Sequence, residues 1–364
     1  MISNPIKVLC LPSYHWYMRK FDDGKYIKFV NPDSDFFMGT NVPNEDDFSQ
    51  LSHLENLKSE FKPTDYDIVH IHFEYQSIPL NTLKRLLDYF DLHKKPIVWT
   101  LHDRKSNDSS YHNPAHDQLL FKRATKVITL TQGCKTWIKQ NFGEHKNEIE
   151  VLQHGYIESP KTIKRLSKKI AKNPNLYTML IGNFRPNKEI LDSVANFLLL
   201  TELSDTKLRL MFNPFTVYSP KNVIDVTMTH FLALIKNNQR IDVQCFPFIE
   251  HDLITKAFLE SHAIILPYKW GTHSGQIELA RDCGCYVVVP NVGFYQEQWE
   301  QVELWDAVGS NKELHPTKYA EALITVHEKK SLNPNPDDRE KEFDSLLKRQ
   351  YLIYKGILER KNEK

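Results

Sequence analysis

Several features that mark particular protein classes are scarce in this chain of 364 residues. No apolar run approaches the roughly 20 residues that cross a bilayer, so the sequence predicts no transmembrane segment. The start of the chain, MISNPIKVLCLP, lacks a long apolar stretch with a small-residue cleavage site, so we expect no signal peptide. The formal net charge is +1, which leaves no basic footprint for nucleic acid. We therefore expect a cytoplasmic protein that binds no nucleic acid.

Cysteine is also sparse, and its pattern excludes two further classes. The cysteines are Cys10, Cys134, Cys245, Cys283 and Cys285. Their odd number and wide scatter argue against a disulfide framework and fit a reducing compartment. Cys283 and Cys285 form the only close pair, and without a second pair we expect no zinc site. These two thiols are expected to pack where a helix turns into the next strand.

The chain contains enough apolar residues for large cores. Hydrophobic residues make up 41% of it and aromatic residues 12%, and its length suggests two domains. Apolar runs that predict strands alternate with helical patterns in two series, which is typical of parallel sheets with helices on both faces. The first series of strands covers 6–11, 67–73, 96–101, 126–130 and 148–152. The second covers 177–181, 207–212, 241–246, 263–266 and 286–289.

The two series are joined near residues 157–175, which places a cleft between two α/β units, the usual position for a ligand site. We expect a first domain over 1–160, a linker over 161–175 and a second domain over 176–339. A break is predicted at Asn173-Pro174, where the basic linker ends. A charged helix over about 340–364 is expected to pack back on the first domain.

The linker carries six positive residues and no acid. They are Lys161, Lys164, Arg165, Lys168, Lys169 and Lys172. One interpretation is contact with anionic lipid, which would make the protein peripheral at the inner membrane face. The other is a solvated helix that covers the domain junction, and we favour it because the apolar face formed by Ile163, Leu166 and Ile170 is narrow.

The segment from Ala263 to Pro290 is the most informative part of the chain. A buried strand leads into the small polar loop Gly271-Thr272-His273-Ser274-Gly275, and a helix follows. Small loop residues let an anion approach the main chain, and a helix start adds unpaired N–H donors and partial positive charge. Glu278, in the first turns, could reach a neutral part of the same ligand. The alternative is a tight loop between two buried elements.

Polar residues follow the predicted strands at the sheet edges where α/β folds bind ligands. His70 and His72 share one face of the second strand, where a buried core histidine is the commoner outcome. His102 follows the third strand and is placed to donate a hydrogen bond or carry a proton. His154 follows the fifth strand at the domain junction, as a hinge or a ligand contact.

A second loop of this kind opens the second half. Gly182 closes its first strand, and Arg185 and Lys188 follow it closely. Two cations at a strand end could neutralise a diphosphate from the side opposite the Gly271 loop. A lone cation in a loop is usually just solvated.

Taken in order, these motifs resemble the glycosyltransferases of the GT-B fold, in particular the large retaining family with nucleotide-sugar donors (glycosyltransferase family 4-like, glycosyl transferases group 1). The resemblance covers nearly the whole chain. In the first half, DIVHIHFEY and PIVWTLHD look like that family's two strand ends, the second with its active-site histidine at His102. The run VITLTQGCKTWIKQNFG and the run EVLQHGY look like the passage into the interdomain crossing, where His154 takes the place of a commoner Asn.

In the second half, LIGNFRPNK looks like the family's glycine loop, with its diphosphate-binding Arg and Lys on Arg185 and Lys188. The donor-site segment of the family looks like LPYKWGTHSGQIELARDCGCYVVVP, and its ribose-binding glutamate falls on Glu278. The glutamate that contacts the donor sugar eight residues earlier falls on Trp270 instead. The glycine-loop arginine is displaced by two residues. No glycine pair occupies the turn between the first predicted strand and the helix after it. Tyr14 and Trp16 lie in this turn and are candidate acceptor contacts.

The resemblance implies two Rossmann-like, doubly wound domains that face each other across a cleft. It implies transfer of a sugar from a nucleoside diphosphate sugar to a glycan, lipid-linked or other hydroxyl acceptor, with retention, in glycan or cell-surface polysaccharide assembly. Arg185 and Lys188 would stabilise the leaving diphosphate in place of a metal, and no cofactor is expected. His102 would meet the sugar or the acceptor. The departure at Trp270 leaves open a catalytically silent partner in a glycosylation complex, and a nucleotide-sugar epimerase is a further alternative.

Overall fold

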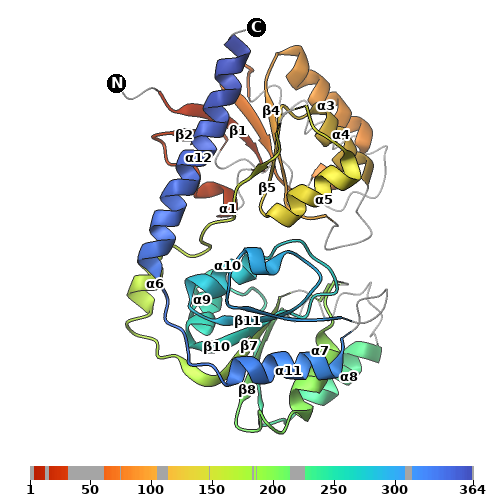
Figure 1. Cartoon of the computed structure of the whole chain (residues 1–364), viewed down its shortest axis with the longest axis vertical. Helices are drawn as coiled ribbons and strands as arrows, with labels where there is room; N and C mark the ends of the chain where they lie inside the picture. The colour runs from red at the N-terminus through yellow and green to blue at the C-terminus, as the bar shows by residue number, and fades with distance from the viewer. Residues whose placement is uncertain are drawn as a thin grey trace. The chain divides into compact units, whose positions relative to one another are not determined.

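The computed structural model describes residues 4–12, 16–31, 61–73, 75–104, 114–146, 148–182, 184–185, 187–213, 226–307 and 314–362. These residues form two compact units, each built on its own sheet (Figure 1). The first unit extends to Gln153 and also includes the chain from Phe343 onward. The second unit spans His154–Glu342. The protein is therefore an α/β protein with two parallel sheets of six strands.

The first unit has a sheet in the order β2-β1-β3-β4-β5-β6, with every neighbouring pair parallel. Its strands are β1 (Ile6–Leu11), β2 (Ile27–Phe29), β3 (Ile68–Ile71), β4 (Ile97–Leu101), β5 (Lys126–Thr129) and β6 (Glu150–Val151). Its helices are α1 (Trp16–Arg19), α3 (Leu80–Leu92), α4 (Pro114–Arg123), α5 (Gln132–Phe142) and the larger part of α12 (Pro336–Asn362). The strands β3, β4 and β5 are buried along their whole length, as expected when helices cover both faces of a parallel sheet.

The second unit has a sheet in the order β12-β11-β10-β7-β8-β9, again with all neighbouring pairs parallel. Its strands are β7 (Asn173–Gly182), β8 (Lys207–Phe212), β9 (Ile241–Cys245), β10 (Ser261–Ile265), β11 (Tyr286–Pro290) and β12 (Val302–Trp305). Its helices are α6 (Pro160–Leu166), α7 (Ile190–Leu199), α8 (Val226–Ile235), α9 (His251–Glu260), α10 (Gly275–Asp282) and α11 (Pro316–His327).

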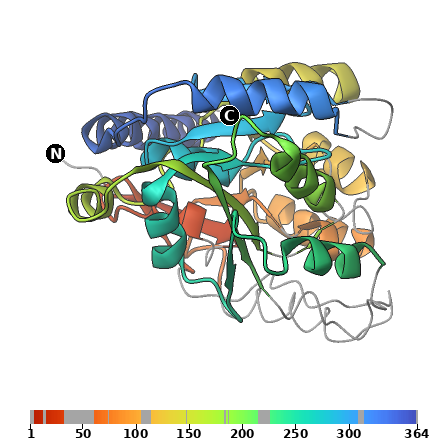
Figure 2. The same cartoon turned by 90° about the horizontal axis from the view of Figure 1, so that it is seen from below.

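Alternation along the strands of the second sheet divides its apolar side chains between two cores. Ala263 and Ile265 of β10 pack with α7, α8 and α11, whereas Ile264 packs on the opposite face with α9 and α10. The helices accordingly lie on both sides of this sheet (Figure 1). In Figure 2, α7 (green) lies between α11 (blue) and α8. This packing fixes α10, and with it the loop that precedes α10.

The predicted strands begin and end within two residues of the observed strands, with one exception. That exception is β7, which begins four residues earlier than predicted. The predicted break at Asn173-Pro174 is wrong, because β7 begins at Asn173. The pairing of Asn173 with Ser261 of β10 adds the N-terminal part of the strand. The short strands β2 and β12 were also missed. In the described part of the chain, no helix combines the length and apolar character needed to cross a membrane.

Candidate functional site

The strand order of the second sheet marks one place for a ligand. From β7 the chain proceeds outward through β8 and β9, and then returns to place β10 on the other side of β7. In open α/β sheets, ligands bind beyond the carboxyl ends of the strands at this reversal. The two loops at that position follow β7 and β10, and they are the two loops that the sequence motifs predicted to bind phosphate.

The main chains of these two loops are directly joined. Lys188 and Tyr268 form an isolated antiparallel bridge. The backbone bonds beside it run from the Lys269 N–H to the Asn187 carbonyl (2.7 Å) and from the Glu189 N–H to the Pro267 carbonyl (2.6 Å). The structure thus brings the cationic loop and the small-residue loop together within the second unit.

The cationic loop holds one exposed and one largely buried positive charge. Arg185 is exposed, whereas Lys188 is drawn inward and its Nζ donates a hydrogen bond to the carbonyl of Ile181. Burial, with the charge of Arg185 adding to it, lowers the pKa of Lys188 to about 7. Gly182 turns the chain at the end of β7 with φ of +58°, in the left-handed region that strains other residues. An anion at this loop would therefore meet the permanent charge of Arg185 and a lysine whose protonation the anion favours.

The small-residue loop ends in a capped helix start. The side chain of Ser274, the N-cap of α10, accepts a hydrogen bond from the Gln276 N–H. The Ser274 N–H itself donates to Oε1 of Gln298 at 2.8 Å. Gly271 lies against the ring of Tyr295, where a Cβ would collide with the phenol oxygen. Thr272, His273 and Gly275 lie between these fixed points.

Glu278 is 3% exposed, and both of its carboxylate oxygens already accept hydrogen bonds. Gln298 Nε2 donates to Oε1 at 2.9 Å, and Arg339 Nη2 donates to Oε2 at 2.8 Å. Gln298 Nε2 also lies 3.1 Å from the Ser274 carbonyl oxygen, to which it donates. The residue predicted to bind ribose therefore belongs to a buried network that reaches the N-cap of α10.

The same arginine holds the other end of α10. Arg339 Nε donates to Oδ1 of Asp282 at 2.7 Å. Oδ2 of Asp282 accepts from the backbone N–H groups of Ile157 (2.7 Å) and Glu158 (3.1 Å). Burial raises the pKa of Asp282, and the Arg339 guanidinium and the two backbone amides oppose that rise.

The remaining predicted contacts of the second unit lie beside the small-residue loop in sequence or in space. His154 is buried, and its ring centroid lies 5.7 Å from that of His273. Trp270, which stands where the resembled family has a glutamate, is half-buried directly before Gly271. The structure thus places His154 next to a residue of the predicted phosphate loop.

In the first unit, three histidines gather near the carboxyl ends of β3 and β4: His70 lies within β3, His72 follows β3 and His102 follows β4. His102 Nε2 lies 3.2 Å from His72 Nδ1, so one of these rings donates to the other and their tautomers are linked. His102 also stacks on Phe73, with 3.9 Å between ring centroids. His70 bonds to Tyr354 (2.5 Å) through Nδ1 and to Thr100 (2.8 Å) through Nε2, and burial lowers its pKa to about 3.

Two of the predicted acceptor contacts cannot be placed. Tyr14 lies outside the described residues, and of Trp16 only the backbone, in α1, is described. Sequence reasoning in turn missed Gln298 and Arg339. No local pattern marks either residue, since Arg339 meets Glu278 across 61 positions of sequence.

The basic segment of the predicted linker divides into two parts. Lys161, Lys164, Arg165, Lys168 and Lys169 are exposed. Lys172 instead turns inward and donates to the carbonyls of Cys283 and Gly284, both at 2.9 Å. Lys164 pairs with Asp337 at 3.0 Å in an exposed ion pair, a kind that contributes little stability.

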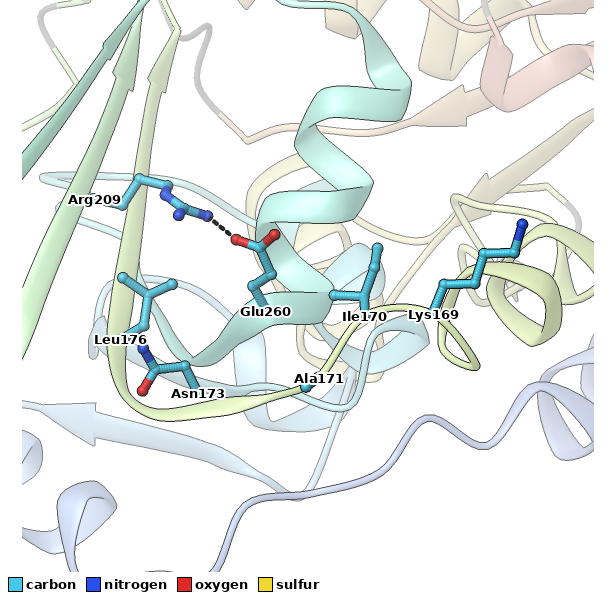
Figure 3. A pocket seen from close by; sticks show the side chains of 7 residues that line it. All are labelled: Lys169, Ile170, Ala171, Asn173, Leu176, Arg209 and Glu260. Atoms are coloured by element: carbon cyan, nitrogen blue, oxygen red, sulfur yellow. Dashed lines mark hydrogen bonds and ion pairs between the residues drawn. The ribbon is translucent and has the colours of Figure 1, made fainter.

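A separate hollow of about 320 Å³ lies where β7 and β8 begin, at the end of the sheet opposite the two loops. Figure 3 shows Arg209 and Glu260 joined at its edge. Arg209 also pairs with Asp242 at 2.7 Å, so two carboxylates already neutralise its charge. Within the described ranges, no cluster of three His, Cys, Asp or Glu side chains could hold a metal ion.

Comparison with known proteins identifies the fold of the chain and a family match over part of it. Residues 31–157, less than half of the chain, match the model of Glycosyltransferase Family 4. No curated protein sequence matches the chain. The matched residues belong mainly to the first unit and include His70, His72 and His102.

Solved structures extend the likeness to both units. An α,α-trehalose 6-phosphate synthase from Burkholderia multivorans has a TM-score of 0.61 at 10% identity, with 99% of each chain covered. A sucrose-phosphate synthase from Thermosynechococcus elongatus has a TM-score of 0.62 at 13% identity, covering 88% of this chain and 81% of its own. The solved structures show that the chain has the GT-B fold, and within it residues 31–157 are similar to Glycosyltransferase Family 4.

Proposed function

We propose that this protein transfers a sugar from a nucleoside diphosphate sugar to an acceptor hydroxyl, with the donor bound by the second unit. The observation that carries the proposal is the pairing of two loops at the strand-order reversal. One loop supplies Arg185 and Lys188, and the other supplies Gly271–Gly275 and the start of α10. A diphosphate suits this pair because cations and main-chain donors converge on one place.

In this proposal the protein acts on the charge of the leaving group. As the glycosidic bond breaks, negative charge grows on the diphosphate. Donors fixed in advance stabilise that charge more than they stabilise the ground state. Arg185 and Lys188 provide the positive charge, so the proposed reaction requires no metal or other cofactor.

Glu278 is proposed to accept hydrogen bonds from the ribose hydroxyls of the donor. An ionised carboxylate offers about four acceptor positions, and Gln298 and Arg339 occupy one on each oxygen. His154 and Trp270 are proposed to line the sugar position. His102 is proposed to contact the transferred sugar or the acceptor, and it enters the proposal through the resemblance of its strand end to that of the family.

Retention at the anomeric carbon, a glycan or lipid-linked acceptor and a role in polysaccharide assembly are further parts of the proposal, and the resemblance alone supports them. The exposed cations of the 161–169 segment would suit an anionic membrane surface. We retain the solvated-helix interpretation for this segment, because Lys172 donates hydrogen bonds to backbone carbonyls of the second unit and Lys164 already pairs with Asp337.

A second candidate function is a silent homologue that serves as a partner in a glycosylation complex. Trp270 favours it, because this residue removes the carboxylate that contacts the donor sugar in the resembled family. Such a protein would turn over no donor. An epimerase, the third candidate, would form product from the donor without any acceptor.

Turnover of a panel of UDP-, GDP- and ADP-sugars, with and without simple sugar acceptors, tests the proposal. We expect one donor to be hydrolysed or transferred by the wild type. Lys188→Ala should lower its turnover roughly 100-fold or more, by analogy with the loss of one fixed donor to a developing anion. Lys164→Ala, an exposed control in the same unit, should keep full activity. Equal turnover by Lys188→Ala and wild type would remove Lys188 from the site.

A further inference from the structure

A continuous hydrogen-bonded path leads from the start of α12 to the proposed phosphate loop, entirely within the second unit. Arg339 Nη2 holds Oε2 of Glu278, and Oε1 of Glu278 accepts from Gln298. The Gln298 amide then bonds to both the N–H (2.8 Å) and the carbonyl (3.1 Å) of Ser274. Two side chains, Glu278 and Gln298, therefore connect the guanidinium to the N-cap of α10.

The geometry of Arg339 suits it to this path better than a lysine would. Its guanidinium is 5% exposed and makes three separate charged contacts, with Glu278, Asp282 and Glu342. The planar fork reaches Glu278 and Asp282 at once, one turn apart on α10, which a single ammonium cannot copy. Asp282 in turn fixes the backbone at Ile157 and Glu158.

We propose that Arg339 is a positioning residue for the donor site: through Glu278 and Gln298 it fixes the main chain of Ser274, and with it the loop that receives the diphosphate. This inference rests on the proposed function for its ligand but not for its geometry. Arg339 contacts Glu278, the proposed acceptor for the ribose hydroxyls, and no residue of the phosphate loop. It acts on that loop through Glu278 and Gln298, which the exchange measurement below tests separately from affinity.

The chain offers a matched control for this arginine. Arg209 lies in the same unit, is also largely buried, and also binds two carboxylates, Asp242 (2.7 Å) and Glu260 (2.6 Å). It lies at the hollow shown in Figure 3, at the opposite end of the sheet from the loops. Loss of its ion pairs should therefore perturb the fold of the unit without moving the loop at Ser274.

The first arm of the test uses the full-length protein without ligand. Arg339→Lys keeps the charge but breaks the fork, and amide hydrogen exchange of residues 272–276 is measured by mass spectrometry. We expect exchange there to rise at least tenfold, whereas Arg209→Lys leaves it within twofold of wild type. Unchanged exchange in Arg339→Lys would overturn the proposal whatever the protein binds.

The second arm measures the affinity of UDP, GDP and ADP by calorimetry. For the nucleotide that the wild type binds, we expect Arg339→Lys to weaken affinity at least tenfold and Arg209→Lys to change it less than twofold. Faster loop exchange with unchanged affinity would contradict a role in donor binding. If the wild type binds none of the three, the proposed function fails, while the exchange arm still decides whether Arg339 orders the loop.

Removal of a partner from a buried ion pair is strongly destabilising, so a second variant guards against loss of the fold. Gln298→Leu leaves Arg339 paired with Glu278 and removes the hydrogen bonds from Gln298 to Glu278 and to Ser274. We expect it to raise exchange at 272–276 as Arg339→Lys does. The double variant should add little to the larger single effect, because both substitutions break one path. Full additivity, or normal exchange in Gln298→Leu, would contradict the path.

Discussion

At the scale of single residues, Lys188 links the proposed site to pH. Burial and Arg185 lower its pKa to about 7 in the ligand-free protein. A diphosphate binds the protonated ammonium better than the neutral amine, so affinity should fall as pH rises through 7, with a limiting loss of roughly tenfold per pH unit. Calorimetry of nucleotide binding at pH 6, 7, 8 and 9 checks this, and binding at pH 8 should take up a proton.

The control for this titration is Lys188→Arg, which stays charged over the whole range. Its affinity should vary little with pH between 6 and 9. A wild-type affinity that is flat over that range would show that Lys188 does not face the bound anion.

His70 gives a second prediction, which concerns stability. Its folded pKa is about 3, because the ring is buried, whereas an unfolded histidine titrates near 6.5. Below pH 6.5 the unfolded chain therefore binds a proton that the folded chain does not, and stability is lost as pH falls toward 3. His70→Gln should lose less stability than the wild type between pH 7 and pH 5, by about 2 kcal/mol in total, in urea unfolding. Equal slopes in both proteins would mean that His70 titrates normally.

At the scale of elements, the loop before α10 depends on the absence of a side chain at Gly271. An added Cβ would collide with the Tyr295 phenol, so Gly271→Ala should displace the loop, cost about 1–3 kcal/mol and weaken nucleotide binding. Gly356→Ala is the matched substitution in α12, where no atom lies within 4 Å of the new methyl group. It should raise stability by about 0.5–1 kcal/mol and leave binding unchanged. Gly271→Ala with wild-type affinity would contradict the placement of the ligand.

The elements also show how far the sequence alone leads. Buried runs such as Ile97–Leu101 and Tyr286–Pro290 were predictable because both of their faces are covered and nearly all of their side chains, Thr100 excepted, are apolar. The strands β2 and β12 were missed because they are short and partly polar, as at Lys28 and Glu303. Pairing with a neighbour, rather than local composition, makes them strands.

The candidate site was also predictable only in part: the two loops were found from the sequence, whereas Gln298 and Arg339 were missed. Gly182 and Gly271–Gly275 follow apolar strands closely, so local order along the chain was enough to find them. Gln298 and Arg339 come from other elements and meet Glu278 only after folding. The buried state of Glu278 follows from those distant partners, and no spacing within α10 indicates it.

At the scale of the whole molecule, the two units rest on separate sheets and separate cores, and both place their candidate residues beyond the carboxyl ends of strands. The loops for the donor lie in the second unit and His102 lies in the first. The chain passes between the units inside α12, where Arg339 and Glu342 belong to the second unit and Phe343 to the first. A nucleotide that binds the second unit should therefore leave amide exchange in β3 and β4 of the first unit unchanged.

The most direct measurement is amide hydrogen exchange of the full-length protein with and without UDP, GDP or ADP. The account predicts that one of these nucleotides slows exchange in the peptides that span Gly182 to Lys188 and Gly271 to Gln276, and leaves the start of β8 unaffected. Slowed exchange at the hollow beside Arg209 with none at the two loops would contradict it, and so would the absence of binding by every nucleotide tested.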